Sequence, residues 1–219
     1  MNYEWVDFTS AIKQRALLDK FESIYNISFP DEDEREPFAN IRGRLQSSGA
    51  FPYTFIILMM DGDEVIGGTI IDWYPKIESA EIIYICIAPD KRGHGLGEEL
   101  YQSAVILFTL NVAPPKYIFI ECDIPERMSG ANNAIDPEAR LRFWRGLGYS
   151  IVPVTHFQPP LSAEQPWDDK MYLMVNKSGT IPTEDVKNFY SEFYRGLNAD
   201  STEMMEKSFD GVGEILDLY

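Results

Sequence analysis

The sequence predicts an α/β domain over residues 1–178 and a helical C-terminal extension over residues 179–219. Two β-rich apolar runs on either side of a polar turn at residues 61–64 predict an antiparallel hairpin. An apolar strand at residues 80–87, a glycine-rich loop, a helical pattern and another strand together predict a βαβ unit, whose two strands are parallel. Behind the first domain the composition changes and an apolar stripe at helical spacing begins, which indicates the extension.

Two helices are predicted ahead of the hairpin. Apolar residues at helical spacing predict the first over residues 10–27, with Ser10 as its N-cap. The pair Phe29-Pro30 ends this helix. The acidic residues 31–34 are expected to open the second helix, which ends near Gly49, because carboxylates stabilise the N-terminal end of the helix dipole.

The elements behind the βαβ unit complete the domain. After the strand at residues 117–122, Asp136 is expected to cap a helix, and residues 149–154 and 170–175 are expected to form two closing strands. Thr183 is expected to cap the helix of the extension. The aromatic residues of that helix leave three roles open: closing over a cleft, packing on the sheet, or binding a second subunit in a homodimer. Packing on the sheet is the default expectation for such a stripe.

The charge of the chain limits its partners. With 19 Lys and Arg against 35 Asp and Glu, the net charge is −16 and the pI is about 4.5. Such a chain repels nucleic acid and anionic membrane surfaces, whose recognition depends on clustered basic residues. It would attract a cationic small molecule or a basic peptide. The alternative is that the acidity serves solubility alone.

The apolar content predicts a protein with a core of its own. Hydrophobic residues make up 45% of the chain and aromatic residues 13%, which is enough for a packed interior. The longest apolar stretch, residues 51–60, is too short to span a membrane. Acidic residues stand near the N-terminus, where a secretory signal would be basic. We therefore expect a soluble, cytoplasmic protein.

The cysteines and histidines predict neither a disulfide nor a metal site. Cys86 and Cys122 each lie inside an apolar run, which is typical of buried thiols. His94 and His156 are far apart in the chain, with no cysteine or carboxylate at ligand spacing. No zinc or other metal is therefore expected.

The glycine loop Arg92-Gly93-His94-Gly95-Leu96-Gly97 carries the strongest functional signal. A glycine-rich turn between a strand and a helix exposes converging backbone N–H groups and lets a phosphate come close. The Arg92 side chain could add a charged contact. The spacing of the glycines does not fit the dinucleotide fingerprint, and the loop lacks the Gly-Lys-Ser/Thr ending of a Walker A motif.

The pattern Arg-x-x-Gly-x-Gly, preceded by Ile-x-Ile-x-Pro, resembles the acetyl-CoA-binding motif of the GNAT (Gcn-related N-acetyltransferase) superfamily over residues 84–110. The order of the elements over residues 1–178 is similar to that superfamily as well. The resemblance implies a GNAT-type mixed, mostly antiparallel sheet with one splayed parallel strand pair, flanked by helices. It also implies acetyl-CoA as the cosubstrate. A glycine loop of other origin remains the alternative.

The resemblance also assigns contacts with the cosubstrate. Backbone groups of Ile85, Cys86 and Ile87 are expected to pair with the pantetheine arm like an added strand. The amides from Arg92 to Gly97 are expected to bind the pyrophosphate. His94 is expected to be a neighbour of the phosphates and not a catalyst.

Two glutamates are candidates for the general base that takes a proton from the amine. Glu81 lies on the strand before the loop, where the histone-acetylating branch of the superfamily carries its base. Burial among apolar neighbours would favour proton uptake there; the alternative is an ordinary strand residue that faces solvent. Glu121, near the end of the next strand, is the second candidate, because the parallel strands are expected to diverge there. Its alternative is a polar residue at a strand end.

Two further positions bear on activity. Trp144 stands where many members of the superfamily place a tyrosine general acid. Because an indole supplies no proton at neutral pH, Trp144 is expected to pack beside the pantetheine. The acidic segment at residues 29–36 borders the acceptor cleft if the resemblance holds, and could receive a cationic amine. A solvated helix start is the alternative.

These observations favour an N-acetyltransferase that moves the acetyl group of acetyl-CoA to a primary amine of a small molecule or peptide. The amine would attack directly, with help from a general base. The alternative is a non-catalytic acyl-CoA-binding or sensing module, which the missing tyrosine at position 144 suggests. A third alternative is a nucleotide-binding protein of another kind.

Overall fold

The computed structural model describes residues 1–32, 35–128, 135–160, 166–199 and 202–219. Its strands are β1 (Asn2–Val6), β2 (Tyr53–Asp61), β3 (Glu64–Tyr74), β4 (Ser79–Ile87), β5 (Tyr117–Asp123), β6 (Ser150–Ile151), β7 (Met171–Val175), β8 (Thr180–Pro182) and β9 (Ile215–Asp217). Its helices are α1 (Arg15–Ser28), α2 (Phe38–Leu45), α3 (Leu96–Asn111), α4 (Pro137–Gly146), α5 (Thr183–Gly196) and α6 (Thr202–Phe209). The chain forms two compact units, the first made of residues 1–73 and 80–115, the second of residues 74–79 and 116–219.

The first unit is built on β1, β2, β3 and β4, which are neighbours in that order. β1 and β2 are antiparallel, with Asn2 opposite Met60. β2 and β3 form the antiparallel hairpin that the sequence predicts, with Tyr53 opposite Trp73. The sequence does not predict β1, because a strand of five residues is too short for a clear periodic pattern.

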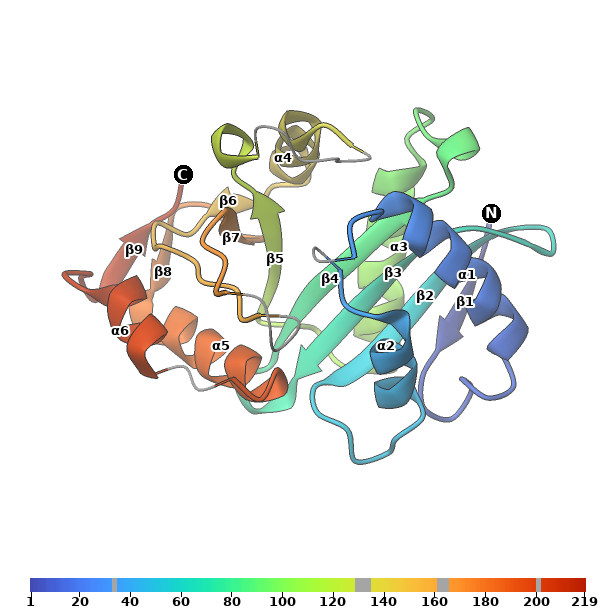
Figure 1. Cartoon of the computed structure of the whole chain (residues 1–219), viewed down its shortest axis with the longest axis horizontal. Coiled ribbons are helices and arrows are strands. Elements are labelled where there is room, and N and C mark those ends of the chain that lie inside the picture. The colour runs from blue at the N-terminus through green and yellow to red at the C-terminus, as the bar shows by residue number, and fades with distance from the viewer. Residues whose placement is uncertain (33–34, 129–134, 161–165, 200–201) are drawn as a thin grey trace. The chain divides into compact units, whose positions relative to one another are not determined.

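Helices cover both faces of these four strands (Figure 1). Alternate residues of a strand point to opposite faces, so Leu58 and Met59 of β2 belong to different apolar clusters. Leu58 lies in the cluster that contains Phe21 of α1 and residues of α2. Met59 lies in the cluster that contains Leu100 of α3. The sheet of this unit is therefore packed between α1 and α2 on one side and α3 on the other.

The first two helices differ from their predicted bounds. α1 begins at Arg15, and Ser10 lies in the turns that precede it. The acidic run does not open α2, which begins at Phe38 directly behind Pro37. Proline lacks the backbone N–H that a helix interior needs, so the helix does not extend across it. Residues 33 and 34 of the acidic run lie outside the described residues.

The second unit contains β5, β7 and β6, which are antiparallel neighbours in that order. α4 begins at Pro137, as predicted, and the Asp136 carboxylate accepts a hydrogen bond from the backbone N–H of Glu138. β8 and β9 pair as a small antiparallel sheet. The sequence does not predict this sheet, because each of its strands has only three residues.

The aromatic stripe of α5 packs on the sheet of the second unit. The ring of Phe189 stacks on that of Phe119 in β5, with 4.0 Å between the centroids. Of the three roles that the sequence leaves open, the structure therefore shows the packing role. The expected boundary at residue 178 falls inside this unit, and the division into domains stays a prediction.

The expected fold class is confirmed, since a mixed, mostly antiparallel sheet is flanked by helices. β4 lies almost wholly in the first unit and β5 in the second. None of the helices in the described residues has the length and apolar character that crossing a bilayer requires.

Candidate active site

The glycine loop leads from the end of β4 into α3. Gly93 and Gly95 have φ angles of +83° and +77°, in the left-handed region that residues with a side chain rarely adopt. Gly95 is the N-cap of α3, whose first residue is Leu96. Because the first N–H groups of a helix have no intrahelical acceptor, they are available at the positive end of the helix dipole. The loop therefore has the geometry of an anion site.

The Arg92 side chain holds the loop from within. Its Nε donates to the carbonyl oxygen of Ile87 at 2.9 Å, and its Nη2 donates to the Ser28 hydroxyl at 2.8 Å. The guanidinium thus ties the loop to the end of β4 and to the end of α1. A contact with phosphate stays a prediction. His94, within the loop, is exposed, with Nδ1 3.4 Å from the carbonyl oxygen of Lys91.

The last residues of β4 are fixed by packing on both faces. Ile85 and Ile87 pack in the apolar cluster that contains Leu100 of α3. Cys86 is buried in the other cluster, and burial raises the pKa of its thiol to about 12. The thiol is therefore neutral near pH 7 and not a nucleophile. Pairing of this segment with pantetheine remains a prediction.

Gly67 of β3 is a residue that the sequence does not single out. A Cβ atom at this position would lie 2.7 Å from the carbonyl oxygen of Cys86 and 2.6 Å from Cδ1 of Ile87. Only glycine lets β3 approach the end of β4 this closely. The glycine pair Gly67-Gly68 inside a strand pattern is the signal that could have identified it.

Glu81 lies near the beginning of β4. It is only 1% exposed, and its neighbours Ala80 and Ile82 are buried too. It is therefore not an ordinary strand residue that faces solvent, which was the alternative to a catalytic role. Its service as general base remains a prediction.

The segment before α2 is held by two tyrosines. The Tyr25 hydroxyl donates to the carbonyl oxygen of Glu36 at 2.7 Å, and the backbone N–H of Glu36 donates to the Tyr84 hydroxyl at 2.9 Å. The rings of Tyr25 and Tyr84 meet edge to face, with centroids 4.8 Å apart, and Phe29 lies 5.0 Å from Tyr84. This aromatic group fixes the segment that the resemblance places beside the acceptor.

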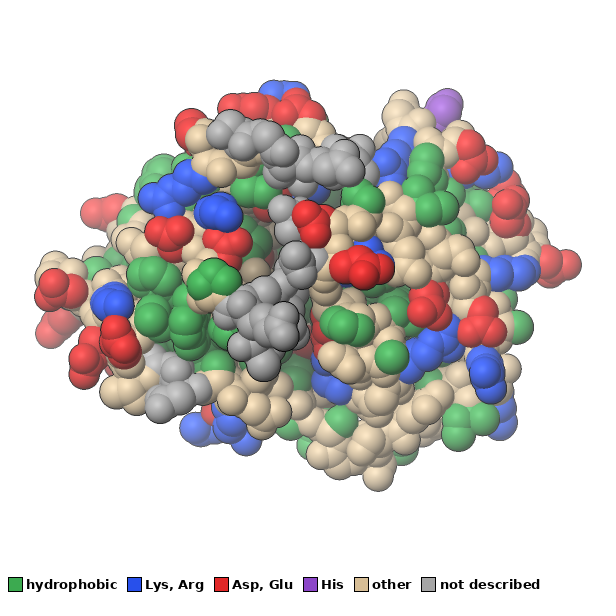
Figure 2. Space-filling model, in the orientation of Figure 1, with side chains coloured by type: hydrophobic (Ala, Val, Ile, Leu, Met, Phe, Trp, Pro, Cys, Tyr) green, Lys and Arg blue, Asp and Glu red, His purple; other side chains and the backbone are tan. Residues whose placement is uncertain are grey.

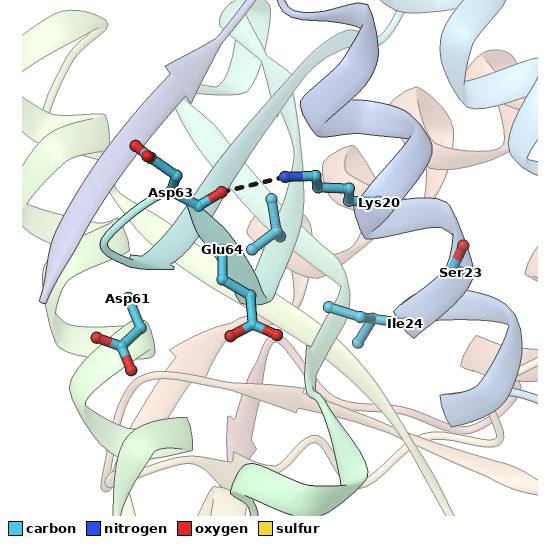
Figure 3. A pocket seen from close by; sticks show the side chains of 7 residues that line it. Lys20, Ser23, Ile24, Asp61, Asp63 and Glu64 are labelled. Carbon is cyan, nitrogen blue, oxygen red and sulfur yellow. Dashed lines mark hydrogen bonds between the residues drawn. The ribbon is translucent and has the colours of Figure 1, made fainter.

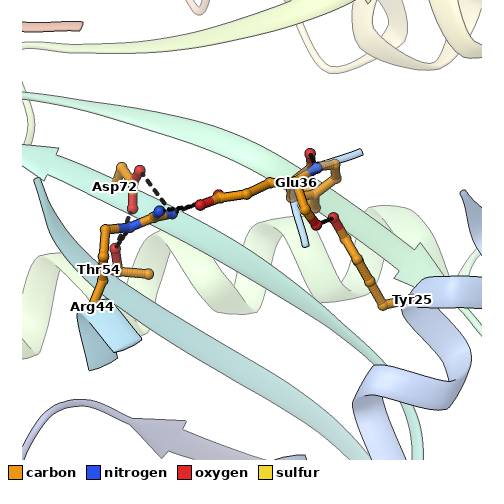
Figure 4. A network of polar contacts seen from close by, with 6 residues as sticks. Tyr25, Glu36, Arg44, Thr54 and Asp72 are labelled. Carbon is orange, nitrogen blue, oxygen red and sulfur yellow. Dashed lines mark hydrogen bonds and ion pairs between the residues drawn. The ribbon is translucent and has the colours of Figure 1, made fainter. Parts of the chain in front are cut away.

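Glu36 of the same segment also belongs to a polar network (Figure 4). The Arg44 guanidinium binds both carboxylate oxygens of Glu36 and donates to the Thr54 hydroxyl at 2.9 Å. That hydroxyl donates to buried Asp72 at 2.6 Å. The Glu36 carboxylate is thus already paired with Arg44. In the same segment the Glu32 carboxylate is paired with Arg35. Both pairings argue against these carboxylates as the receptor for a cationic amine.

In the second unit Glu121 lies among residues that sequence reasoning misses. The His156 Nε2 lies 2.5 Å from Oε1 of Glu121, and its Nδ1 lies 2.9 Å from the Tyr190 hydroxyl. Gln158 Nε2 donates to the other oxygen of Glu121 at 3.3 Å. These residues come from β5, from α5 and from the segment that follows β6, so no local sequence motif indicates the group.

Trp144 lies in α4 and is 4% exposed. Its ring contacts those of Phe143 and Tyr149, each with a centroid separation of 5.1 Å. The indole is thus packed among its own neighbours, and a contact with pantetheine stays a prediction.

The predicted site residues are divided between the two units. The first unit contains Glu81, the end of β4 and the glycine loop, whereas the second contains Glu121 and Trp144.

One cavity of about 690 Å³ lies between α1 and the turn of the β2–β3 hairpin (Figure 3). Its lining includes Lys20, which donates to the carbonyl oxygen of Asp63 at 3.1 Å. None of the predicted site residues lines it. We therefore do not assign it to the reaction.

Two further observations concern the charged side chains on the surface and the groups that could bind a metal. On the face shown in Figure 2, Asp and Glu side chains are interspersed with Lys and Arg and do not form one acidic patch. Among the described residues, no group of three or more His, Cys, Asp or Glu side chains could hold a metal ion.

Solved structures share this fold at low sequence identity. A protein of Bacteroides thetaiotaomicron assigned to the GNAT family has a TM-score of 0.65 and 19% identity, over 89% of this chain and 96% of its own. Tetrahymena GCN5 has a TM-score of 0.55 and 13% identity, over 80% of this chain and 94% of its own. The PaiA N-acetyltransferase of Thermoplasma acidophilum, solved in complex with coenzyme A, has a TM-score of 0.50 and 10% identity, over 81% of this chain and 99% of its own.

The sequence comparison points to the same family. No curated protein matches the chain. Residues 17–113 match the acetyltransferase (GNAT) family, and this stretch contains β4, the glycine loop and α3. The resemblance to this family that the glycine loop shows is therefore confirmed over residues 17–113.

Proposed function

We propose that this protein is an acetyl-CoA-dependent N-acetyltransferase that acts on a primary amine of a small molecule or peptide. The observation that carries the proposal is the loop after β4, where Gly93 and Gly95 adopt left-handed conformations at the N-terminus of α3. A Cβ atom on either glycine would meet nothing within 4 Å, so the loop is open to a ligand such as the pyrophosphate of CoA. The complex of the Thermoplasma relative with coenzyme A supports this choice of ligand.

In the proposed reaction the amine nitrogen attacks the carbonyl carbon of the acetyl thioester. The new C–N bond forms, the C–S bond breaks, and the amine gives up one proton. Glu81 takes that proton, directly or through a water, and Glu121 is the second candidate for this role. The departing thiolate takes a proton from water or from a tyrosine, because Trp144 cannot supply one.

The residues of the first unit would orient the reactants. The loop amides bind the diphosphate, and the backbone at Ile85, Cys86 and Ile87 pairs with the pantetheine arm. Arg92 holds the loop against the end of β4 and the end of α1 through its hydrogen bonds to Ile87 and Ser28. The net charge of −16 favours a cationic acceptor.

A non-catalytic acyl-CoA-binding module is the second candidate, because Trp144 replaces the usual acid. One assay separates the two. The purified protein is incubated with acetyl-CoA and a panel of primary amines, and the release of free CoA thiol is measured. We expect thiol release that depends on at least one amine. Tight binding of acetyl-CoA without thiol release from any amine would support the module instead.

A further inference from the structure

Near the end of β4, every second residue directs a backbone group at β3. The carbonyl oxygen of Tyr84 accepts a hydrogen bond of 2.9 Å from the Thr69 hydroxyl. Two residues on, the carbonyl oxygen of Cys86 would lie 2.7 Å from a Cβ atom added to Gly67. Two residues further, the N–H of Ala88 donates to a carbonyl oxygen of β3 at 2.8 Å. Both Thr69 and Gly67 belong to β3.

The residues between these point the other way. In an extended strand the N–H and C=O of one residue point to one side, and those of the next residue point to the opposite side. The backbone groups of Ile85 and Ile87 are therefore directed away from β3. The Ile87 carbonyl is already engaged there, because it accepts the hydrogen bond from Nε of Arg92. Of the three residues proposed to pair with pantetheine, Ile85 is thus the one placed to use both of its backbone groups.

Thr69 fixes the peptide group that contains the N–H of Ile85. A peptide group is planar and trans, so its C=O and its N–H point in opposite directions. The carbonyl oxygen of Tyr84 and the N–H of Ile85 belong to the same peptide group. By holding that carbonyl on the side of β3, the Thr69 hydroxyl holds the N–H of Ile85 on the opposite side. Thr69 is completely buried, so bulk water does not compete for this hydrogen bond.

We propose that Thr69 is a positioning residue for the pantetheine arm of acyl-CoA, and that it acts through the N–H of Ile85. This inference rests on the proposed CoA-dependent function. It makes the affinity for CoA depend on a side chain of β3, outside the glycine loop. The middle of β4 is accessible for such pairing, because residues 83–85 are partly exposed whereas the other residues of the strand are buried.

Two ligands that differ by the pantetheine arm test the proposal. CoA carries the arm, and adenosine 3′,5′-bisphosphate lacks it. Thr69→Val keeps the shape of the side chain and removes the donor. By calorimetry, the affinity for CoA should fall about tenfold, the scale of one hydrogen bond, and the affinity for adenosine 3′,5′-bisphosphate should not change. Equal losses for both ligands, or no loss for either, would overturn the proposal.

Thr69→Ser separates the hydroxyl from the rest of the side chain. It keeps the donor, so it should bind CoA nearly as tightly as the wild type does. The matched control is Thr54→Val, because Thr54 is another buried threonine of the same unit, whose hydroxyl donates to Asp72. It should lower the stability of the protein and leave the ratio of the two affinities unchanged. CoA binding by Thr69→Ser as weak as that by Thr69→Val, or an equal change of the ratio in Thr54→Val, would contradict the role of the Thr69 hydroxyl.

NMR of the isotope-labelled wild-type protein tests the same proposal if Thr69→Val does not fold. The amide proton resonance of Ile85 should move to lower field when CoA is added, because the N–H gains an acceptor. It should keep its position when adenosine 3′,5′-bisphosphate is added. An Ile85 resonance that does not move at saturating CoA would overturn the proposal. If the wild type binds neither ligand, the proposed CoA-dependent function itself is refuted.

Discussion

The hydroxyl of Ser28, the last residue of α1, accepts a 2.8 Å hydrogen bond from the guanidinium of Arg92, the first residue of the glycine loop. The same guanidinium donates to the carbonyl oxygen of Ile87. One side chain therefore connects the helix, the end of β4 and the loop. This explains how a loop with two flexible glycines can keep a defined shape.

The Ser28–Arg92 bond can be removed by Ser28→Ala. The bond joins a charged donor to a half-buried network, so its loss should lower the free energy of unfolding by about 1–2 kcal/mol. CoA affinity should fall only a few-fold, because the Ile87 contact of Arg92 remains. Thermal unfolding and calorimetry measure the two effects. Ser23→Ala, on the same helix, is the control, and an equal loss of stability there would contradict the assignment.

The conformation of Gly95 can be tested by Gly95→Val. Its φ of +77° strains any β-branched residue, so the loop amides should move and CoA affinity should fall by about tenfold or more, given a strain of about 1–2 kcal/mol. Calorimetry with CoA measures this. Gly49→Ala is a suitable control, since that glycine has no positive φ and nothing within 4 Å of an added Cβ. Unchanged affinity in Gly95→Val would rule out the loop as the CoA site.

Glu81→Gln tests the proposed base. The change keeps the shape of the side chain and removes its basicity, so the rate should fall about 10²-fold or more. Because the base must be ionised to accept a proton, the wild-type rate should rise with pH over the range in which it ionises, and the variant should lack that rise. Glu64→Gln, at the exposed start of β3, is the control. A variant with wild-type rate and pH profile would exclude Glu81.

Trp144→Tyr distinguishes packing from proton supply. The indole is buried against Phe143 and Tyr149. If it also packs beside the pantetheine, as proposed, the smaller ring should weaken the free energy of CoA binding by about 1 kcal/mol through lost apolar area. We expect a few-fold weaker CoA binding and no gain in maximal rate. A variant that turns over much faster with unchanged CoA affinity would show that a proton donor at position 144 limits the reaction.

Asp72 should make stability depend on pH. Burial raises the pKa of this carboxyl above its usual range, although the Arg44 guanidinium opposes the shift. A raised pKa means that, at intermediate pH, the folded protein holds a proton that the unfolded chain releases. The contribution of Asp72 to the free energy of unfolding is therefore present at low pH and is lost as the pH rises through the pKa of the folded state. Asp72→Asn should remove that decline from the unfolding free energy measured by denaturant titration. Asp61→Asn, which is exposed, should keep it.

Much of the fold can be predicted from local patterns. The β2–β3 hairpin, the strand–loop–helix unit around the glycine loop and the Asp136 cap of α4 all agree with the sequence. Each depends on neighbours in the chain, such as turn residues, glycine spacing or an N-cap. The start of α2 is different, because the charge of the acidic run suggested a helix there, whereas Pro37 sets where it begins.

The sequence alone determined the resemblance to the GNAT family, because the glycine loop acts through its own backbone and needs its glycines at fixed spacing. Only the tertiary structure decided which residues surround Glu121. His156 and Tyr190 lie 35 and 69 positions further along the chain, and packing of α5 on β5 brings the group together. Contacts between distant segments depend on how apolar faces pack, and no spacing rule along the chain records them.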